Sequence, residues 1–110
     1  LMTEAVRPTI SVALCTYNGA DHLPEQWHSL VAQEQLPDEV VICDDQSSDN
    51  TVTLLHELAA QAPFRVRILQ NPARLGYNRN FEKAMRETTG DLIFLCDQDD
   101  YWLPEKIRVM

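Results

Sequence analysis

The chain has 110 residues, a hydrophobic content of 45% and a formal net charge of −8 at pH 7. This length allows one domain at most, and the mixture of apolar and charged residues is typical of a folded globular protein. The negative charge argues against nonspecific binding to nucleic acid or to an anionic membrane surface. It still allows an anionic small ligand, because a bound metal ion can reverse the local sign of the charge.

The start of the chain does not resemble a signal peptide, because residues 1–8 include Glu4 and Arg7 and lack an apolar core. We expect residues 1–8 to be a disordered lead or a remnant of cloning, and residues 9–110 to belong to one domain that continues beyond Met110. No apolar stretch reaches the length of a transmembrane helix. The cysteines are odd in number, widely spaced and without a Cys-x-x-Cys pair, which favours a reducing cytoplasm: Cys15, Cys43 and Cys96.

Strands and helices are predicted to alternate, beginning with an apolar strand at residues 10–15. Further strands are expected at residues 39–43, 65–69 and 92–96. Apolar residues between the strands repeat at helical spacing, in three sets: Leu23, Trp27, Leu30 and Val31; Val52, Leu55, Leu58, Ala59 and Ala62; and Phe81, Ala84, Met85 and Thr88. The alternation predicts an α/β fold, a parallel sheet with crossover helices.

Several residues mark the expected ends of the helices. Ser48 or Asp49 can cap the second helix, and Pro63 ends it. Gly90 lies where the third helix is expected to end, and Pro104 should open a fourth.

The burial of two strands can be predicted from their patterns. Residues 65–69 alternate between arginine and apolar residues, which indicates a strand at the edge of the sheet. Residues 92–96 are all apolar, which indicates a strand buried on both faces. Right-handed crossovers then favour the strand order 3-2-1-4, in which the first and fourth strands are neighbours.

Polar residues follow a cysteine at the end of three of these strands, in the strings Cys15-Thr16, Cys43-Asp44-Asp45 and Cys96-Asp97. In open α/β sheets, ligands bind in the crevice outside the carboxyl ends of the strands. We interpret the cysteines as small buried apolar residues.

The acidic string Asp97-Gln98-Asp99-Asp100 predicts a cation site at this crevice. Two carboxylates about 4 Å apart repel by roughly 4 kcal/mol at an effective dielectric near 20. A shared divalent metal ion would relieve this repulsion, and oxygen ligands select such ions. The alternative interpretation is a solvated acidic turn.

Several other chemistries are disfavoured by the composition. The glycines cannot form a G-x-G-x-x-G or Walker loop, because there are only Gly19, Gly76 and Gly90. No Ser/His/Asp set is recognisable. Asp49 suits a helix start, where a carboxylate is stabilised, whereas Asp44 and Asp45 lie too early to cap and could accept hydrogen bonds from a ligand N–H.

Four motifs in order carry a resemblance to a known family: Ser11-Val12 leading to Tyr17-Asn18, Asp44-Asp45-Gln46-Ser47-Ser48-Asp49-Asn50-Thr51, Gly90-Asp91, and Asp97-Gln98-Asp99-Asp100. From about Ile10 onward the chain resembles the amino-terminal half of a family 2 glycosyltransferase. The resemblance implies the GT-A fold, whose amino-terminal half is a Rossmann-like parallel sheet. It also implies a nucleotide-diphosphate sugar as the donor.

The resemblance implies roles for individual residues. Cys15, Thr16 and Tyr17 would line the nucleotide pocket, and Asp45 would accept a hydrogen bond from the base. Residues 71–80 would pass beside the nucleotide, where Arg74 or Arg79 could contact it. Asp97 would approach the ribose or hold a metal-bound water, and Asp99 would bind Mg²⁺ or Mn²⁺ directly. That metal would stabilise the leaving nucleoside diphosphate.

The resemblance further implies an inverting transfer to a saccharide or lipid-linked saccharide, as in the synthesis of bacterial surface polysaccharide. The general base would lie beyond Met110, and the location would be the cytoplasm or the inner face of the membrane. Many relatives have an Asn-x-Gly element where this chain reads Asn78-Arg79-Asn80-Phe81. Tyr101 and Trp102 are expected to pack at the corner after the fourth strand in preference to contacting a sugar.

Three alternatives remain open at this point. A sugar-phosphate nucleotidylyltransferase resembles this fold, but its glycine-rich amino-terminal loop is missing here. A phosphoacceptor signalling domain carries its acidic pair after the first strand, where this chain has Cys15-Thr16. A non-catalytic module that binds divalent ions would show no preference for nucleotides.

Overall fold

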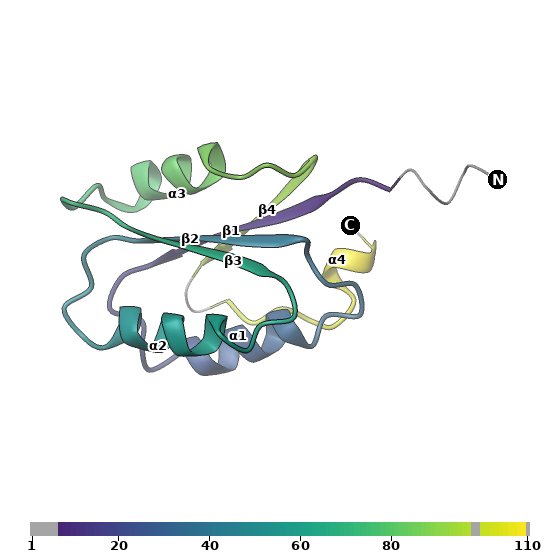
Figure 1. Ribbon diagram of the computed structural model, residues 1–110, viewed down its shortest axis with the longest axis horizontal. Coiled ribbons are helices and arrows are strands. Elements are labelled where there is room, and N and C mark those ends of the chain that lie inside the picture. Colours follow the sequence, from purple (N-terminus) through teal and green to yellow (C-terminus); the bar gives the residue numbers. More distant parts are fainter. Residues whose placement is uncertain (1–6, 98–99, 110) are drawn as a thin grey trace.

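The computed structural model describes residues 7–97 and 100–109 (Figure 1). Its elements follow the predicted alternation: β1 (Ile10–Thr16), α1 (Leu23–Val31), β2 (Glu39–Asp44), α2 (Thr51–Ala59), β3 (Arg65–Gln70), α3 (Tyr77–Arg86), β4 (Leu92–Asp97) and α4 (Lys106–Val109). Of the predicted lead, residues 1–8, only Arg7 and Pro8 are described, and both are exposed. Among the described residues, no helix has the length and apolar character that crossing a bilayer requires.

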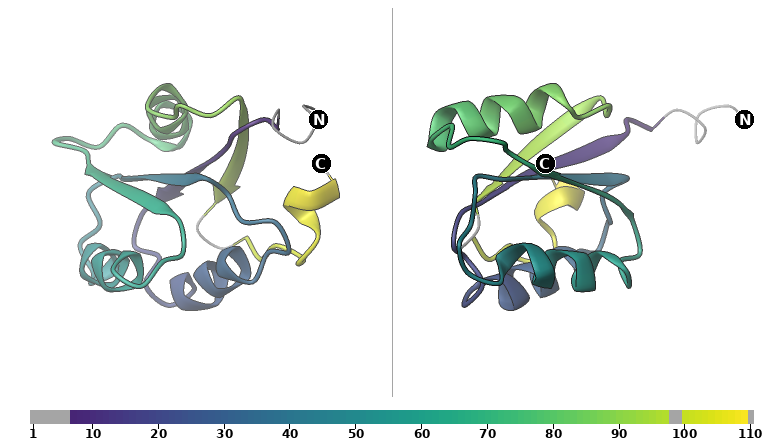
Figure 2. Two further views of the ribbon diagram at one scale, coloured as in Figure 1. Left: turned by 45° about the vertical axis from the view of Figure 1, so that its right-hand side comes forward. Right: turned by 60° about the vertical axis from the view of Figure 1, so that its left-hand side comes forward.

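The four strands form one parallel sheet in the order β3-β2-β1-β4, which confirms the predicted topology. In the register, Val12 of β1 lies opposite Val40 of β2 and Phe94 of β4. Helices α1 and α2 cover one face of the sheet and α3 covers the other (Figure 2). The carboxyl ends of β1 and β4 are therefore neighbours at the point where the strand order reverses.

The sheet separates two apolar cores of unequal size. The larger core lies between the sheet and helices α1 and α2, and it also contains Trp102 and Ile107. The smaller core lies under α3 and is formed by five residues: Ala13, Cys15, Cys43, Phe81 and Ala84. All residues of β1 and β2 are buried, as expected for central parallel strands covered on both faces.

The predictions for the two outer strands, β3 and β4, have opposite results. The prediction that residues 65–69 form an edge strand is confirmed, because β3 ends the sheet on one side. The prediction that residues 92–96 are buried on both faces is wrong: Leu92, Ile93 and Leu95 are 42%, 42% and 50% exposed. Within the described residues β4 pairs only with β1, so it also lies at an edge of the sheet. An apolar composition is therefore not enough to predict that a strand has a neighbour on both sides.

Helix ends were predicted less accurately than the helices themselves. Helix α2 ends at Ala59, three residues before the last apolar residue of its predicted stripe, and α3 begins at Tyr77, one turn earlier than expected. Gly90 does not end α3, whose C-cap is Glu87. The N-cap of α2 is Asn50, and not Ser48 or Asp49 as predicted. Asp49 lies just before it, and its carboxylate accepts a hydrogen bond from the backbone N–H of Thr51 at 3.0 Å.

The two aromatic residues after β4 differ. Trp102 is 4% exposed and packs against Phe94 with ring centroids 5.9 Å apart, which confirms the packing interpretation. Tyr101 is 57% exposed, so the same prediction is wrong for it.

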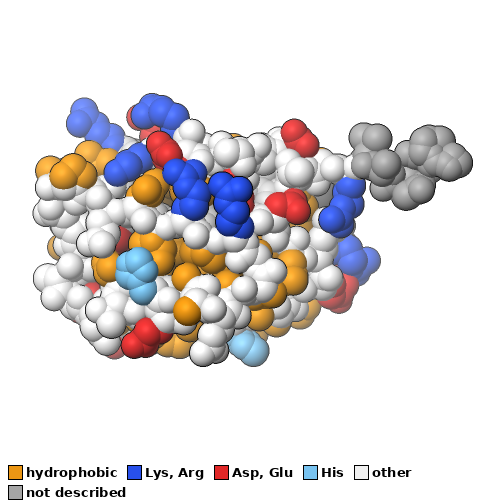
Figure 3. Space-filling model, viewed as in Figure 1, with side chains coloured by type: hydrophobic (Ala, Val, Ile, Leu, Met, Phe, Trp, Pro, Cys, Tyr) orange, Lys and Arg blue, Asp and Glu red, His pale blue; other side chains and the backbone are white. Residues whose placement is uncertain are grey.

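Charge is unevenly distributed over the surface, since Lys and Arg side chains gather over α3 and the adjoining part of β3 (Figure 3).

Candidate functional site

A pocket of about 300 Å³ opens at the carboxyl ends of β1, β2 and β4. Its lining contains all six of the described residues that were predicted to bind a nucleotide: Cys15, Thr16, Tyr17, Asp45, Arg74 and Asp97. Tyr77 and Asn80 of α3 complete the lining. The predicted metal ligand Asp99 lies outside the described residues. Arg79, the alternative to Arg74, is exposed and does not line the pocket.

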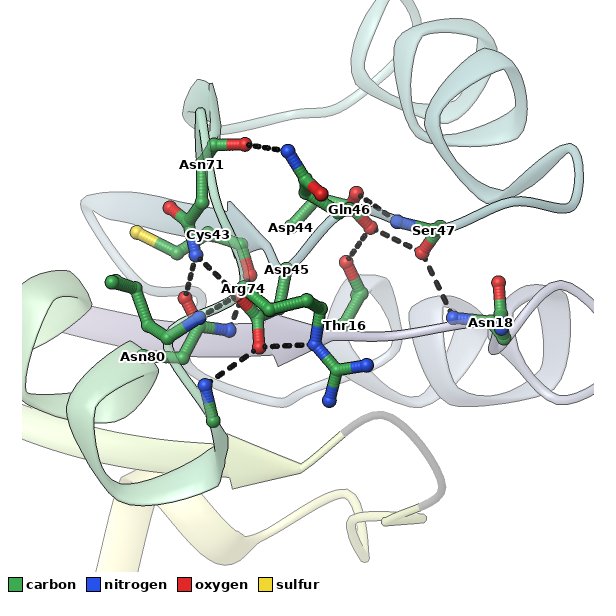
Figure 4. A network of polar contacts seen from close by, with 12 residues as sticks. Thr16, Asn18, Cys43, Asp44, Asp45, Gln46, Ser47, Asn71, Arg74 and Asn80 are labelled. Carbon is green, nitrogen blue, oxygen red and sulfur yellow. Dashed lines mark hydrogen bonds and ion pairs between the residues drawn. The ribbon is translucent and has the colours of Figure 1, made fainter.

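Asp45 accepts four hydrogen bonds at the edge of the pocket (Figure 4). Its Oδ1 accepts hydrogen bonds from Asn71 Nδ2 and the Leu75 backbone N–H, at 3.0 and 2.8 Å. Its Oδ2 accepts from Arg74 Nε and the Gly76 backbone N–H, at 3.0 and 2.9 Å. These four donors match the four acceptor positions of a carboxylate, so Asp45 fixes the loop between β3 and α3.

The environment of Asp45 keeps it ionised. Burial alone would raise the pKa of this carboxyl group, but the hydrogen bonds from Leu75, Asn71, Gly76 and Arg74 outweigh that effect and lower the pKa to about 2. The group is 3% exposed. The pocket thus contains a fixed negative charge whose position depends on the loop.

Asp44 is not free to bind a ligand, contrary to one interpretation of the sequence. Its Oδ1 accepts hydrogen bonds from the hydroxyl groups of Thr16 and Ser47, at 2.7 and 2.6 Å. Its Oδ2 accepts from the Ser47 backbone N–H at 2.9 Å, and the residue is 1% exposed. Asp44 therefore holds the end of β1 and the turn after β2 in place.

The loops after β1 and β2 are joined through Asn18, which adopts a positive φ of 50°. Its side-chain oxygen accepts hydrogen bonds from the backbone N–H groups of Ser48 and Asp49, at 2.7 and 3.3 Å. Its own backbone N–H donates to the Ser47 hydroxyl at 2.8 Å. The two loops beside the pocket thus form one connected unit.

Tyr17 and Arg74 form one wall of the pocket. The guanidinium carbon of Arg74 lies 3.7 Å from the centroid of the Tyr17 ring, a cation–π contact. Arg74 also forms an ion pair with Asp45, although its side chain remains 51% exposed. The wall therefore presents a positive charge and an aromatic ring together.

Tyr77 and Asn80 lie within residues 71–80, the segment expected beside the nucleotide, but neither was predicted individually because the apolar repeat of α3 begins only at Phe81. The first turn of the helix is polar, so apolar spacing could not detect it. Asn80 is buried, and its amide donates to the Cys43 carbonyl oxygen at 2.9 Å and accepts from Asn71 Nδ2 at 2.7 Å. The charge of Asp97 is the largest of the effects that raise the pKa of the Tyr77 hydroxyl, which also hydrogen-bonds that carboxylate.

The oxygen ligands at the end of β4 fit a hard divalent cation in kind. Asp97 lines the pocket, and Asp100 follows shortly after it in sequence. Carboxylate oxygens are the ligands that Mg²⁺ and Mn²⁺ prefer. In the described part of the chain, however, no group of three or more His, Cys, Asp or Glu side chains is placed to hold a metal.

The three cysteines are buried free thiols, as the interpretation of small apolar residues requires. Burial raises the pKa of each thiol above its usual value: Cys15, Cys43 and Cys96. They are therefore neutral near pH 7, and Cys15 contributes a neutral surface to the pocket.

The family model described as Glycosyl transferase family 2 matches residues 11–110. The dTDP-rhamnosyl transferase RfbG of Shigella flexneri is 31% identical over 99 residues, covering 86% of this chain and 34% of that protein. The chain spans between 27% and 34% of the length of such curated relatives.

Two solved structures match the fold closely. S. aureus TarS 1-349 in complex with UDP has a TM-score of 0.83 and 26% identity, covering 92% of this chain and 30% of that one. The mannosyltransferase PcManGT of Pyrobaculum calidifontis, in complex with GDP-Man and Mn²⁺, has a TM-score of 0.80 and 28% identity. This match covers 88% of the present chain and 29% of the PcManGT chain.

Proposed function

Because the chain belongs to glycosyl transferase family 2, we propose that it forms the donor-binding part of an enzyme that transfers sugar from a nucleotide-diphosphate sugar. The observation that carries this proposal is the meeting of six predicted residues around one pocket. The pocket lies at the switch point of an open α/β sheet, where ligands bind in such folds. UDP and GDP-Man, the ligands of the TarS and PcManGT structures, belong to the same chemical class.

The nucleoside is proposed to bind against Cys15, Thr16 and Tyr17. Asp45 already accepts four hydrogen bonds, so an N–H of the base would have to replace one of them. Arg74 is the donor most easily replaced, because its side chain is half exposed while two other donors belong to the backbone. Once released from Asp45, its guanidinium could pair with the diphosphate.

Asp97 and Asp99 are proposed to hold Mg²⁺ or Mn²⁺. When bound, such an ion would neutralise negative charge on the leaving nucleoside diphosphate. The chain's own contribution is to fix Asp97, which lies opposite Cys15 in the pairing of β4 with β1. The PcManGT complex with Mn²⁺ supports this choice of metal; Asp99, outside the described residues, stays a prediction.

We also propose that the whole protein has the activity that the family resemblance implies. The transfer would invert the anomeric centre, with a general base supplied beyond Met110 and a saccharide or lipid-linked saccharide as acceptor. A role in bacterial surface polysaccharide synthesis fits the dTDP-rhamnosyl transferase among the relatives. A cytoplasmic location is supported by the three free thiols, which are expected in a reducing compartment.

Thermal melts of the 110-residue chain test the proposal. The protein is melted with Mn²⁺, with UDP, dTDP or GDP, and with each combination. A ligand at 100 times its dissociation constant stabilises by about 2.7 kcal/mol, which raises the Tm of a domain of this size by several degrees. We expect a rise that requires both the metal and one of the diphosphates.

Variants assign the effect to the site. Asp97→Asn and Asp99→Ala should abolish the rise, whereas Glu57→Gln, an exposed carboxylate on α2, should leave it unchanged. A rise with metal alone would favour the ion-binding module. No rise with any combination, in a protein that melts cooperatively, would contradict the proposal.

A further inference from the structure

Helix α1 and the residues that follow it present a row of buried polar side chains toward the segment after β4. Gln26, Ser29 and Gln33 are 2%, 2% and 5% exposed. The spacing of three residues places Gln26 and Ser29 on one side of α1, and Gln33 follows directly after the C-cap of the helix, Ala32. We call these three residues the polar row. Buried positions of a surface helix are usually apolar, so a polar row needs an explanation.

Each member of the polar row is hydrogen-bonded to the chain between residues 97 and 107. Gln26 Nε2 donates to the carbonyl oxygen of Asp97. Ser29 Oγ accepts from the Trp102 backbone N–H at 3.1 Å. Gln33 Nε2 donates to the Leu103 carbonyl oxygen at 2.6 Å, and its Oε1 accepts from the Ile107 backbone N–H at 3.1 Å.

Gln26 acts at the position that matters most for the pocket. The carbonyl oxygen it binds also accepts a hydrogen bond from the Asp100 backbone N–H at 3.1 Å. The Asp97 backbone N–H in turn donates to Asp100 Oδ2 at 3.0 Å. Gln26 Nε2 also lies 2.8 Å from Cys96 Sγ. The backbone that carries the Asp97 carboxylate is therefore held from both α1 and Asp100.

The position of Gln26 is not explained by stability alone. Its Oε1 is buried and has no hydrogen-bond partner among the described residues, and an unpaired buried acceptor is destabilising. An apolar side chain of similar size would avoid this cost. Gln26 is also absent from the lining of the pocket, so it acts on a ligand only through another residue.

We infer that Gln26 is a positioning residue for Asp97, so that the affinity for the divalent metal depends on a side chain of α1 that lines no part of the pocket. The part of this inference that concerns the metal rests on the proposed function. The part that concerns the effect of Gln26 on the backbone of Asp97 does not. Groups that orient a metal ligand typically change metal affinity by about 10- to 100-fold when they are removed.

The test compares Gln26→Leu with the wild-type chain and with Gln33→Leu, a control in the same polar row that bonds to Ser29 of α1 and to residues 103 and 107, but not to Asp97. Mn²⁺ binding is measured by electron paramagnetic resonance in the presence of UDP. We expect a dissociation constant raised at least about 10-fold in Gln26→Leu and less than about 2-fold in Gln33→Leu. Equal affinity in Gln26→Leu and wild type would overturn the inference.

Amide hydrogen exchange in the metal-free protein gives a second readout. Exchange at Asp97 and Asp100 should accelerate in Gln26→Leu and stay at the wild-type rate in Gln33→Leu. If the wild-type chain binds no Mn²⁺, the proposed function fails, and exchange alone decides: an unchanged rate at both amides overturns the inference. If Gln26→Leu does not fold, Gln26→Met, which keeps the length of the side chain without the amide, is measured instead.

Discussion

Gly90 lies in direct contact with Ser11, at the end of the sheet opposite the pocket. The Gly90 backbone N–H donates to Ser11 Oγ at 2.8 Å, and a Cβ added to Gly90 would lie 2.5 Å from that oxygen. The same Cβ would lie 2.9 Å from the Ser11 backbone nitrogen. Gly90 is therefore required by the close approach of the α3–β4 connection to β1, and not by a helix end.

Gly90→Ala should destabilise the fold by about 1–3 kcal/mol, the usual cost of forcing extra atoms into a packed position. For a chain of this size, a fall in Tm of roughly 4–20 °C should follow. Thr53→Ala, at an exposed position of α2, serves as the control and should change Tm little. A Gly90→Ala protein that melts at the wild-type temperature would show that the connection can move away from β1.

Asp45 should make the stability of the chain depend on pH below about 4. Its pKa falls from 3.8 to about 2 on folding, so its contribution is full above the unfolded value and is lost as the pH falls through the folded one. This difference corresponds to about 2 kcal/mol. Urea unfolding of wild type and Asp45→Asn should therefore differ most at pH 7 and converge toward pH 2.

Glu39 will leave some acid sensitivity in Asp45→Asn. Burial opposes ionisation of Glu39, but hydrogen bonds from Ser11 and Thr89 outweigh it and lower the pKa of this carboxyl group. Its contribution to stability is likewise present at neutral pH and lost on acidification. A constant difference between Asp45→Asn and wild type from pH 7 to pH 2 would contradict the role assigned to the Asp45 charge.

Asn80 should be worth more to stability than its neighbour Asn78. Asn80→Ala removes a bond to the Cys43 carbonyl and another from Asn71, in a buried place. Leaving such groups unpaired costs about 1–3 kcal/mol each, so we expect a loss of about 2–4 kcal/mol by chemical denaturation. Asn78 is exposed on the same helix, and Asn78→Ala should cost less than about 0.5 kcal/mol. Equal losses in the two variants would mean that the bonds of Asn80 contribute nothing net.

The strand order and the polar residues at the strand ends could be predicted from local signals, whereas Tyr17 and Arg74 were predicted only from the family resemblance. The alternation of strands and helices, with right-handed crossovers, leaves few topologies, and it brings Thr16 and Asp97 to the same edge of the sheet. The exposure of Leu95 could not be predicted in this way. The apolar composition of a strand indicates only that its burial would be favourable. Whether the strand is buried depends on the elements that lie next to it.

Polar residues in buried places account for the other omissions. Gln26 interrupts the apolar face of α1 formed by Leu23, Trp27 and Leu30, and periodicity treats such a residue as facing solvent. Asn80 lies just before the apolar repeat of α3, so periodicity did not identify it as buried either. Each side chain has a partner far away in sequence, 71 residues for Gln26 and Asp97 and 37 residues for Asn80 and Cys43, which no local pattern could reveal.

Arg74 and Arg79 offer the sharpest comparison for the proposed donor site, because the sequence left the choice between them open. Arg74 lines the pocket, contacts Tyr17 and pairs with Asp45, whereas Arg79 is exposed on α3 away from the lining. Each is changed to Met, which removes the charge and keeps most of the length. Both variants lose the same charge, so a difference between them reports position.

We expect Arg74→Met to weaken nucleoside diphosphate binding about 10-fold or more, since a hydrogen bond to a charged group contributes about 1.5–3 kcal/mol. Arg79→Met should stay within about 2-fold of wild type. Isothermal titration with Mn²⁺ and the diphosphate that gives the largest thermal shift measures both. A larger loss in Arg79→Met would transfer the phosphate contact to α3 and place the nucleotide beside the first turn of that helix.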